Sequence, residues 1–425
     1  MGLLIMAVVS FLGYKSSTWS QEGSFQSQLV SFSSQEKPVN IAVATDLHYL
    51  SSSLTDGGTF FTDLVKNADG KNMFYIEDIT ESFVTTMIQE KPEILILSGD
   101  LTFNGESQSH LDLEKKLSRI RQNGTQILVI PGNHDIDRSS AAGFYGDGYE
   151  LVDTVSKEEF AMIYQNYGLQ VSLDRDDTSL SYLYRARKDF WILMLDSNSH
   201  GTNEISDQTF SWIEEILKDA KEQDSQVLAV SHQNLLAHNP YFTEGFLIDR
   251  SQELEALYEK YDVMANLSGH IHIQHIKDKG LPEILTSALP VFPHHYGMIQ
   301  FDGKTLDYQA KSIDVGSWAR EQGLTDQKLL DFSQASRAFM EEVAARKLEP
   351  DLLDSQLTSL ERELLLQTFA QINADYFAGR QIDPANHQQG LSLMQETGLS
   401  FYPTYIDSIL KSAEKGHESF QLELE

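Results

Sequence analysis

The stretch Ile127–Asp135, Ile-Leu-Val-Ile-Pro-Gly-Asn-His-Asp, joins an apolar run to a short polar turn. The run predicts a buried strand, and Pro131 and Gly132 then stop the ladder and turn the chain. This turn would hold Asn133 and His134 at the carboxyl end of a sheet. An Asn amide oxygen is a neutral, hard ligand for a cation, and a His donates a proton near pH 7. The stretch therefore outlines a small active site.

Polar side chains follow five predicted strands in this way. They are Asp46 and His48, Asp100, Asn133 and His134, His232, and His270 and His272. Open α/β sheets bind ligands where the carboxyl ends of their strands converge. Asp-x-His and His-x-His place two side chains on one face of an extended segment, which suits chelation of one ion. A lone carboxylate such as Asp100 can bridge two cations, and a mixture of His and carboxylate suits Mn, Fe or Zn.

The amino-acid composition limits which kinds of site and partner the protein can have. The 425 residues include no cysteine, which excludes disulfides, zinc–thiolate sites, iron–sulfur clusters and thiol catalysis. The formal net charge of -31 argues against binding polymeric nucleic acid by a basic surface. A small phosphate ester remains compatible if metal ions supply local positive charge.

Three regions follow from the pattern along the chain. Residues 1–37 hold an apolar segment and a linker, and residues 38–318 alternate strand and helix patterns, which predicts an α/β catalytic domain. We expect residues 51–69 and 138–153 to form loops over the site. Helical periodicity runs from about Thr325 to Leu410, which predicts that residues 319–425 form an all-α domain of three to five helices. We expect this domain to cover the metal cleft and restrict substrate size.

The N-terminal region carries the apolar run Leu3–Leu12. It is shorter than the about 20 residues of a bilayer span but suits the apolar core of an export signal. We therefore expect an exported protein, secreted or at the cell surface, with a possible membrane tether. A cytoplasmic protein with an apolar N-terminal tail is the alternative.

Taken together, these motifs resemble the calcineurin-like metallophosphoesterase superfamily over about residues 40–310. The resemblance implies a four-layer α/β/β/α sandwich with two metal ions. Carried over by position, the first metal would be bound by Asp46, His48 and His272, and the second by Asn133, His232 and His270, with Asp100 as the bridge. His134 would act beside the scissile phosphate as proton donor or charge stabiliser, and Asp135 would orient it.

The chemistry expected from this centre is phosphate ester hydrolysis. Two cations would clamp a bridging water, the resulting hydroxide would attack phosphorus, and His134 would protonate the leaving alkoxide. Phe103 stands where purple acid phosphatases have a Tyr ligand, and the helical C-terminal region differs from that of bacterial nucleotidases. The layout resembles bacterial cyclic-nucleotide phosphodiesterase-like members, which implies phosphodiester substrates, with cyclic nucleotides among the candidates.

Two other functions stay open at this point. One is a phosphomonoesterase or pyrophosphatase that acts on nucleotides or cell-envelope phosphates. The other is a non-catalytic, metal-stabilised binding protein at the cell surface, which the complete ligand set disfavours.

Several further residues have two interpretations. Asn104 could reach the substrate phosphate or form a turn, and Arg138 could bind a phosphate oxygen or form a surface salt bridge. His238 is a candidate to line the pocket, as are His275, His294 and His295, with packing or capping as the alternative. Asp196 and Asn198 could orient a ligand histidine or simply form a turn.

Overall fold

The structure is a computed structural model that describes residues 37–353 and 355–424. The apolar run Leu3–Leu12, on which the expectation of export rests, lies outside the described residues. None of the helices within the described ranges is both long enough and apolar enough to span a bilayer.

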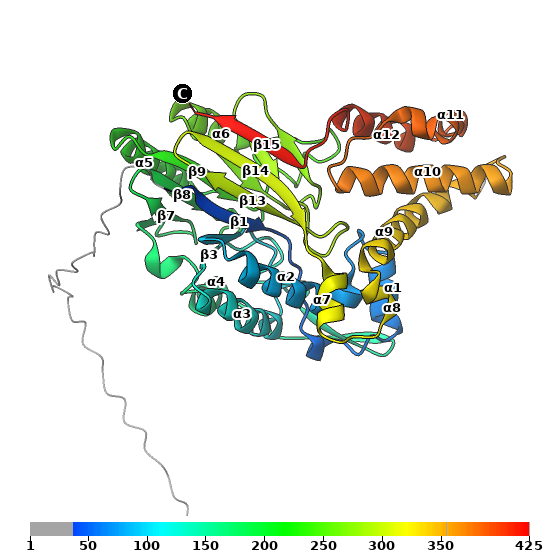
Figure 1. Ribbon diagram of the computed structural model, residues 1–425, viewed down its shortest axis with the longest axis horizontal. Helices are drawn as coiled ribbons and strands as arrows, with labels where there is room; N and C mark the ends of the chain where they lie inside the picture. The colour runs from blue at the N-terminus through cyan, green and yellow to red at the C-terminus, as the bar shows by residue number, and fades with distance from the viewer. Residues whose placement is uncertain (1–36, 354, 425) are drawn as a thin grey trace, which may run out of the picture. The chain divides into compact units, whose positions relative to one another are not determined.

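Two β-sheets form the centre of the catalytic region (Figure 1). The first has the order β15-β14-β13-β1-β2-β3, built from Ser419–Glu423, Thr305–Ser312, His295–Phe301, Val39–Ala44, Ile94–Leu97 and Gln126–Val129. Strands β1, β2 and β3 run parallel, so their carboxyl ends lie at one edge. This edge carries the turns that follow Ala44, Leu97 and Val129.

The second sheet has the order β11-β12-β10-β9-β8-β7-β6. Its strands are His275–Lys277, Glu283–Leu285, Ala265–Ser268, Gln226–Ser231, Phe190–Leu195, Tyr182–Arg187 and Asp174–Arg175. Strands β8, β9, β10 and β12 are parallel, which again brings the ends of β9 and β10 together.

Helices cover the outer face of each sheet, and the sheets pack on one another between them. Between the sheets, Ile41 and Ile96 of the first share a core with Ile192 and Val230 of the second. The first sheet packs outward on α2 (Ile76–Glu90) and α3 (Ser107–Gln122). The second packs outward on α5 (Asp207–Glu222) and α6 (Ser251–Lys260). The predicted four-layer α/β/β/α sandwich is therefore confirmed.

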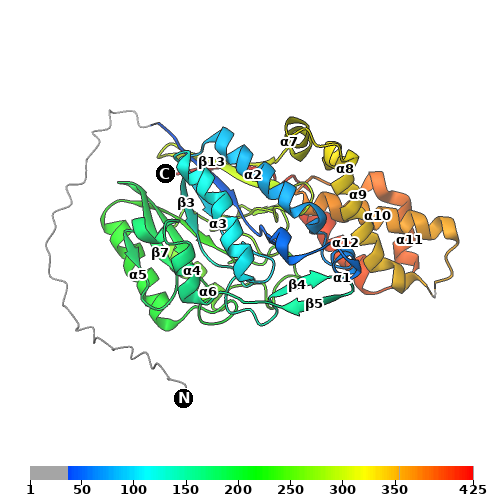
Figure 2. The same ribbon diagram turned by 90° about the horizontal axis from the view of Figure 1, so that it is seen from below.

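The two expected loops contain regular structure. Residues 51–69 form a 3-10 turn, η1 (Ser52–Leu54), and the helix α1 (Thr59–Lys66), and residues 138–153 form the hairpin of β4 (Ala142–Tyr145) and β5 (Gly148–Leu151). Figure 2 shows this hairpin beside α1, where Phe60 and Phe61 pack against Phe144. The loop interpretation was wrong because it rested on the many Gly and Asp residues, whereas the aromatic contacts between the two segments support regular structure in both. The remaining short elements are η2 (Met73–Tyr75), α4 (Lys157–Ile163) and η3 (Leu169–Val171).

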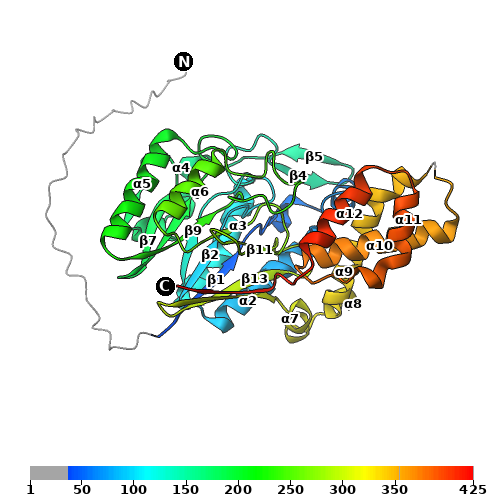
Figure 3. The same cartoon turned by 90° about the horizontal axis from the view of Figure 1, so that it is seen from above.

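The described part of the C-terminal region contains six α-helices. They are α7 (Val315–Glu321), α8 (Gln327–Leu330), α9 (Phe332–Leu348), α10 (Ser359–Phe377), α11 (Gln388–Glu396) and α12 (Phe401–Ser412), with 3-10 turns η4 (Glu349–Leu352) and η5 (Pro384–His387). Figure 3 shows α9–α12 gathered into a bundle. The expectation of an all-α region was wrong at its end, because β15 returns to pair with β14 in the first sheet.

The helical bundle shares a core with the catalytic region. Ile271 and Ile273, which flank the ligand candidate His272, pack in one cluster with Leu348, Leu365 and Ile372. Residues 38–425 accordingly form one compact unit. The expected domain boundary near residue 318 stays a prediction.

Candidate metal centre

Five of the seven expected ligands have a backbone conformation that is unusual for residues other than glycine. The φ angles are 51° at Asp46, 44° at His48, 49° at Asp100, 70° at His270 and 63° at His272. Each such residue costs about 1–3 kcal/mol and persists only where the surroundings enforce it, which occurs most often at functional sites. The fold therefore bends the chain sharply at the end of β1, β2 and β10 to aim these side chains inward.

Glycines next to the ligands allow the turns to approach one another. A Cβ added at Gly132 would collide with the Asp100 carboxylate, and one at Gly269 would collide with Thr45 and the Asp46 carboxylate. At Gly99, whose φ is 98°, a Cβ would lie 2.7 Å from His232 Nδ1. Only glycine fits at these three positions, which explains why it precedes Asp100, Asn133 and His270.

One candidate ligand group consists of Asp46, His48 and His272, whose ligand atoms lie within 4.8 Å of one another. His272 Nε2 is 3.1 Å from His48 Nε2 and 3.4 Å from Asp46 Oδ1. The other nitrogen of His272, Nδ1, lies 3.2 Å from the Asp69 carboxylate. The Nε2 atoms of both histidines therefore face the same point as the free Asp46 oxygen.

A second group consists of Asp100, His232 and His270, also within 4.8 Å. His232 Nδ1 donates to the Ser98 carbonyl at 3.0 Å, and its Nε2 lies 3.3 Å from Asp100 Oδ2 and 3.1 Å from Asn133 Oδ1. Asp100 Oδ2 is also 3.8 Å from His48 Nε2 in the first group. One carboxylate oxygen thus lies between the two groups, as a bridging ligand requires.

The donor atoms suit cations. Asp46 Oδ1 is buried and has no hydrogen-bond partner among the described residues, while Oδ2 accepts from Thr45 Oγ1 and from the His270 N–H. A buried, unpaired carboxylate oxygen is costly unless a cation faces it. Two imidazole nitrogens 3.1 Å apart likewise need a proton or a metal between them.

The pKa values show how strongly the site attracts positive charge. Burial opposes protonation of His232 and His272, yet Asp100 in one case and Asp46 with Asp69 in the other raise both pKa values to about 9. Burial lowers the pKa of His48 well below its usual value and that of His270 to about 4. Each group thus has one histidine that competes for a proton and one that is neutral, the form that binds a metal.

His134 lies beside the first group, with its ring centroid 5.1 Å from that of His48. Its Nδ1 is 2.9 Å from both the Phe103 carbonyl and Asn104 Oδ1, so Nδ1 carries the hydrogen. Its backbone N–H donates to Asp100 Oδ1 at 2.7 Å. These contacts leave Nε2 of His134 for a substrate, and Asn104 orients the ring. Asn104 lies in a bend of the chain, and its contact with a substrate phosphate stays a prediction.

Asp135 has a different role from the expected one. Its carboxylate accepts the backbone N–H groups of Leu101, Thr102 and Gly132 at 2.8–3.1 Å. The expectation that Asp135 orients the His134 ring was wrong, because the side chain points back into the fold. Burial and the nearby Asp100 raise the pKa of Asp135 to about 7. Asp135 ties the turn after β2 to the turn after β3.

The sequence did not single out Asp69 and Lys71. Asp69 fixes His272 through Nδ1, and the Lys71 ammonium lies 3.4 Å from Asp69. Lys71 is almost fully buried and contributes to lowering the pKa values of His48 and His134. The loop composition of residues 51–69 was the only sequence signal for this side of the site.

Asn198 supports the second group. It donates to the Pro131 carbonyl at 3.2 Å and to Gln233 Oε1 at 3.1 Å, while Gln233 Nε2 reaches Asn133 Oδ1 at 3.5 Å. Asp196 accepts the N–H groups of Leu180 and Asn198, so it holds the loop that carries Asn198. Asn198 thus reaches the ligand candidate Asn133 through Gln233, and the expected contact with a ligand histidine stays a prediction.

Four expected pocket histidines lie elsewhere. His238 is 5% exposed, and its ring contacts His275 Nδ1 at 2.8 Å and Glu283 at 3.1 Å. Its assignment to substrate binding was therefore wrong: the residue belongs to a buried polar cluster. His294 contacts the Leu289 carbonyl and Ser336, and His295 is also buried.

Arg138 borders the site on another side. It is half-buried, its Nε has no hydrogen-bond partner among the described residues, and it lines a cavity of about 270 Å³ with Asn133, Asn198 and Ser199. Its contact with a substrate phosphate stays a prediction.

The chain belongs to the calcineurin-like phosphoesterase family, whose model matches residues 39–274. Membership makes it a metal-dependent phosphoric ester hydrolase, and the two ligand groups define a dinuclear centre. A second model, described as the C-terminal domain of cyclic nucleotide phosphodiesterase, matches residues 314–416.

The chain is also similar to individual proteins. A protein of Arcobacter nitrofigilis named probable glycerophosphodiester phosphodiesterase GpdQ is 26% identical over 250 residues, which span 56% of this chain and 78% of that protein. A dimetal phosphatase from Danio rerio aligns with 65% of this chain and 96% of its own, at 14% identity and a TM-score of 0.48. GAP50, the anchor in the inner membrane complex of Plasmodium, aligns with 65% and 85% at 11% identity and a TM-score of 0.42.

Proposed function

We propose that this protein hydrolyses small phosphodiesters at a dinuclear centre. The observation that carries the proposal is the position of Asp100 Oδ2, 3.3 Å from His232 Nε2 in one ligand group and 3.8 Å from His48 Nε2 in the other. Asp46, His48 and His272 would hold one ion, Asn133, His232 and His270 would hold the other, and Asp100 would serve both. The match of residues 314–416 to a phosphodiesterase C-terminal domain supports diester substrates.

The residues of this chain orient the proton donor for hydrolysis at phosphorus. When bound, two cations neutralise phosphoryl oxygens and lower the pKa of water. Asn104 and the Phe103 carbonyl hold the His134 ring through Nδ1, so Nε2 is available to protonate the leaving oxygen. Burial lowers the pKa of His134, and Asp100 acts in the opposite direction. The two acceptors at Nδ1 stabilise the protonated ring that proton donation needs.

Mn, Fe or Zn fits the donor set, which combines four histidines, two carboxylates and one amide. The substrate is a small diester, in keeping with the name of the Arcobacter relative and with the C-terminal match. The second candidate is a phosphomonoesterase or pyrophosphatase, because the dinuclear centre by itself suits both ester classes.

The test compares bis(para-nitrophenyl) phosphate with para-nitrophenyl phosphate, with and without Mn(II), in the wild type and in Asp100→Asn. We expect Mn-dependent cleavage with the diester preferred, and loss of activity in the variant with reduced metal content. Faster cleavage of the monoester would move the assignment to a phosphatase. Two bound metals without hydrolysis of either ester would contradict the proposed function.

We also propose that the protein is exported. The support is the apolar run Leu3–Leu12 followed by a Ser- and Gln-rich stretch. Fractionation of cells that express the full chain tests this: recovery with the medium or the cell surface is expected, and recovery in the cytoplasm alone contradicts it.

A further inference from the structure

An apolar cavity of about 530 Å³ lies directly against the metal centre. Its wall on the catalytic side includes the ligand candidates His270 and His272 together with Asp69, and its opposite wall comes from α9, α10 and α12. The Phe246 ring is 5.5 Å from the His270 ring, so the cavity begins next to the ligand groups. A chemical group that fills this cavity would therefore lie next to a phosphate bound at the metals.

The walls of this cavity are mostly aromatic and aliphatic. The C-terminal helices contribute Met340, Val343, Ala344, Phe369, Phe377 and Tyr405. Phe242 and Phe246 of the loop after β9 close the other side, with ring centroids 5.4 Å apart. Ligand pockets in this size range bind by burying apolar surface, with few polar groups to set orientation.

The hydroxyl and amide groups on the cavity wall have partners within the protein, whereas Asp69 Oδ1, beside His272, has none among the described residues, and Lys347 also lines the cavity. Tyr405 donates to Asn373 Oδ1 at 3.2 Å, and Asn373 Nδ2 donates to the Phe369 carbonyl at 2.8 Å. The Tyr402 hydroxyl lies 2.9 Å from Asp351, and the Tyr241 hydroxyl donates to Thr404. A nucleobase buried among the aromatic and aliphatic side chains would lose its hydrogen bonds with water and, away from Asp69 and Lys347, gain few in return.

We infer that this cavity binds an apolar substituent of the substrate, an alkyl or aryl group esterified to the phosphate. The inference rests on the proposed function, because it places the phosphate of that substrate at the two metals. It favours a diester with a hydrophobic alcohol over a nucleotide. The C-terminal helices thereby select the substrate by its apolar part as well as by its size.

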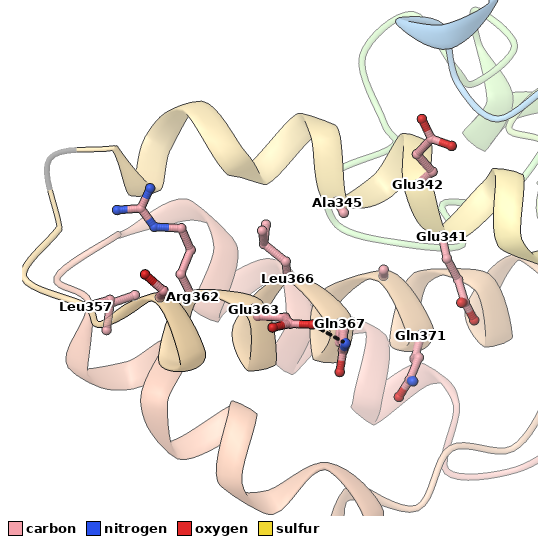
Figure 4. Close-up of a pocket in the computed structure, with 11 residues that line it drawn as sticks. Glu341, Glu342, Ala345, Leu357, Arg362, Glu363, Leu366, Gln367 and Gln371 are labelled. Atoms are coloured by element: carbon pink, nitrogen blue, oxygen red, sulfur yellow. Dashed lines mark hydrogen bonds between the residues drawn. The ribbon is translucent and has the colours of Figure 1, made fainter.

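Two neighbouring alanines on α9 provide a matched pair of variants. Ala344 lines the apolar cavity, whereas Ala345 lines a separate pocket between α9 and α10 whose walls include Glu341, Arg362 and Glu363 (Figure 4). Ala344→Phe fills part of the cavity beside the metals, and Ala345→Phe adds the same side chain about 100° around the helix, in the separate pocket. Phe246→Ala alters the cavity from the opposite wall and guards against misfolding of a helix variant.

The experiment measures kcat/KM of the full chain with Mn(II) for para-nitrophenyl diesters whose second group is methyl, butyl, octyl, phenyl or thymidine. All share one leaving group, so the differences report the second group. We expect kcat/KM to rise about threefold to fourfold for each methylene that the cavity buries, through KM, and then to level off. Comparison of the octyl and phenyl diesters shows whether the cavity prefers a linear alkyl group or an aromatic ring. Ala344→Phe and Phe246→Ala should lower the octyl-to-methyl ratio at least tenfold, and Ala345→Phe should keep it.

Isothermal titration calorimetry with octylphosphonate and methylphosphonate tests the cavity assignment separately from the proposed phosphodiesterase function. If no diester is hydrolysed but octylphosphonate binds more tightly and Ala344→Phe removes the difference, the cavity assignment stands and the proposed function fails. If diesters are hydrolysed without a preference for the octyl or phenyl group, or with a preference for thymidine, the cavity assignment is overturned.

Discussion

Removal of the Asn104 side chain tests how this site orients its proton donor. Asn104 Oδ1 is one of two acceptors, both 2.9 Å from His134 Nδ1, and the other is the Phe103 carbonyl. A hydrogen bond to a charged group contributes about 1.5–3 kcal/mol, and the remaining acceptor places the loss at the low end of that range. Because about 1.4 kcal/mol is a factor of ten in rate, we expect kcat to fall about tenfold in Asn104→Ala.

The assay is kcat and KM for two diesters, one with an alkyl and one with a nitrophenyl leaving group, together with metal analysis. A poor leaving group depends on protonation, so the alkyl ester should show the full loss and the nitrophenyl ester much less. Metal content and KM should stay as in the wild type, and Asn104→Asp, which keeps an acceptor, should recover most of the rate. Equal losses on both esters, or a raised KM with kcat unchanged, would refute the orienting role and favour a direct contact between Asn104 and the substrate phosphate.

Three further predictions concern groups around the centre. Asp69→Asn should weaken binding of one metal about 10-fold to 100-fold, because Asp69 holds His272 Nδ1 at 3.2 Å, and isothermal titration should show one weakened site of two. Glu283→Gln should lower the free energy of unfolding by about 3–5 kcal/mol in urea, because the buried carboxylate accepts from five donors; a change below about 1 kcal/mol would contradict this. His294 is buried, and burial lowers its pKa to about 4. Its contribution to the free energy of unfolding is therefore complete above the unfolded-state pKa of about 6.5 and is lost as the pH falls toward 4. Between pH 7.5 and 5 this loss is about 2 kcal/mol, and His294→Asn should show a urea stability that falls less steeply over that range.

The motif residues were predictable because each follows its strand directly in the sequence. An apolar run followed by Gly-Asp or Gly-Asn-His gives both the strand and the polar group at its end, so the structure brings together Asp100, Asn133 and the ligands of the second sheet. Parallel pairing of β1, β2 and β3 then places the turns at one edge. Local pattern and topology suffice for this part of the site.

Other features depend on contacts that local pattern does not contain. Asp69 is far in sequence from His272, and nothing around it distinguishes it from other loop aspartates. His238 follows a motif strand, as a pocket residue would, but its ring turns toward Glu283 in the sheet. Strand β15 pairs with β14 more than a hundred residues earlier, a contact that short-range periodicity cannot reveal.

Diffraction from crystals grown with Mn(II), recorded at the manganese absorption edge, tests the central claim most directly. We predict two anomalous peaks about 3.5–4 Å apart. One should lie against Asp46, His48 and His272, and the other against Asn133, His232 and His270, with Asp100 between them. A single peak, or peaks away from these residues in a protein that hydrolyses phosphate esters, would contradict the account.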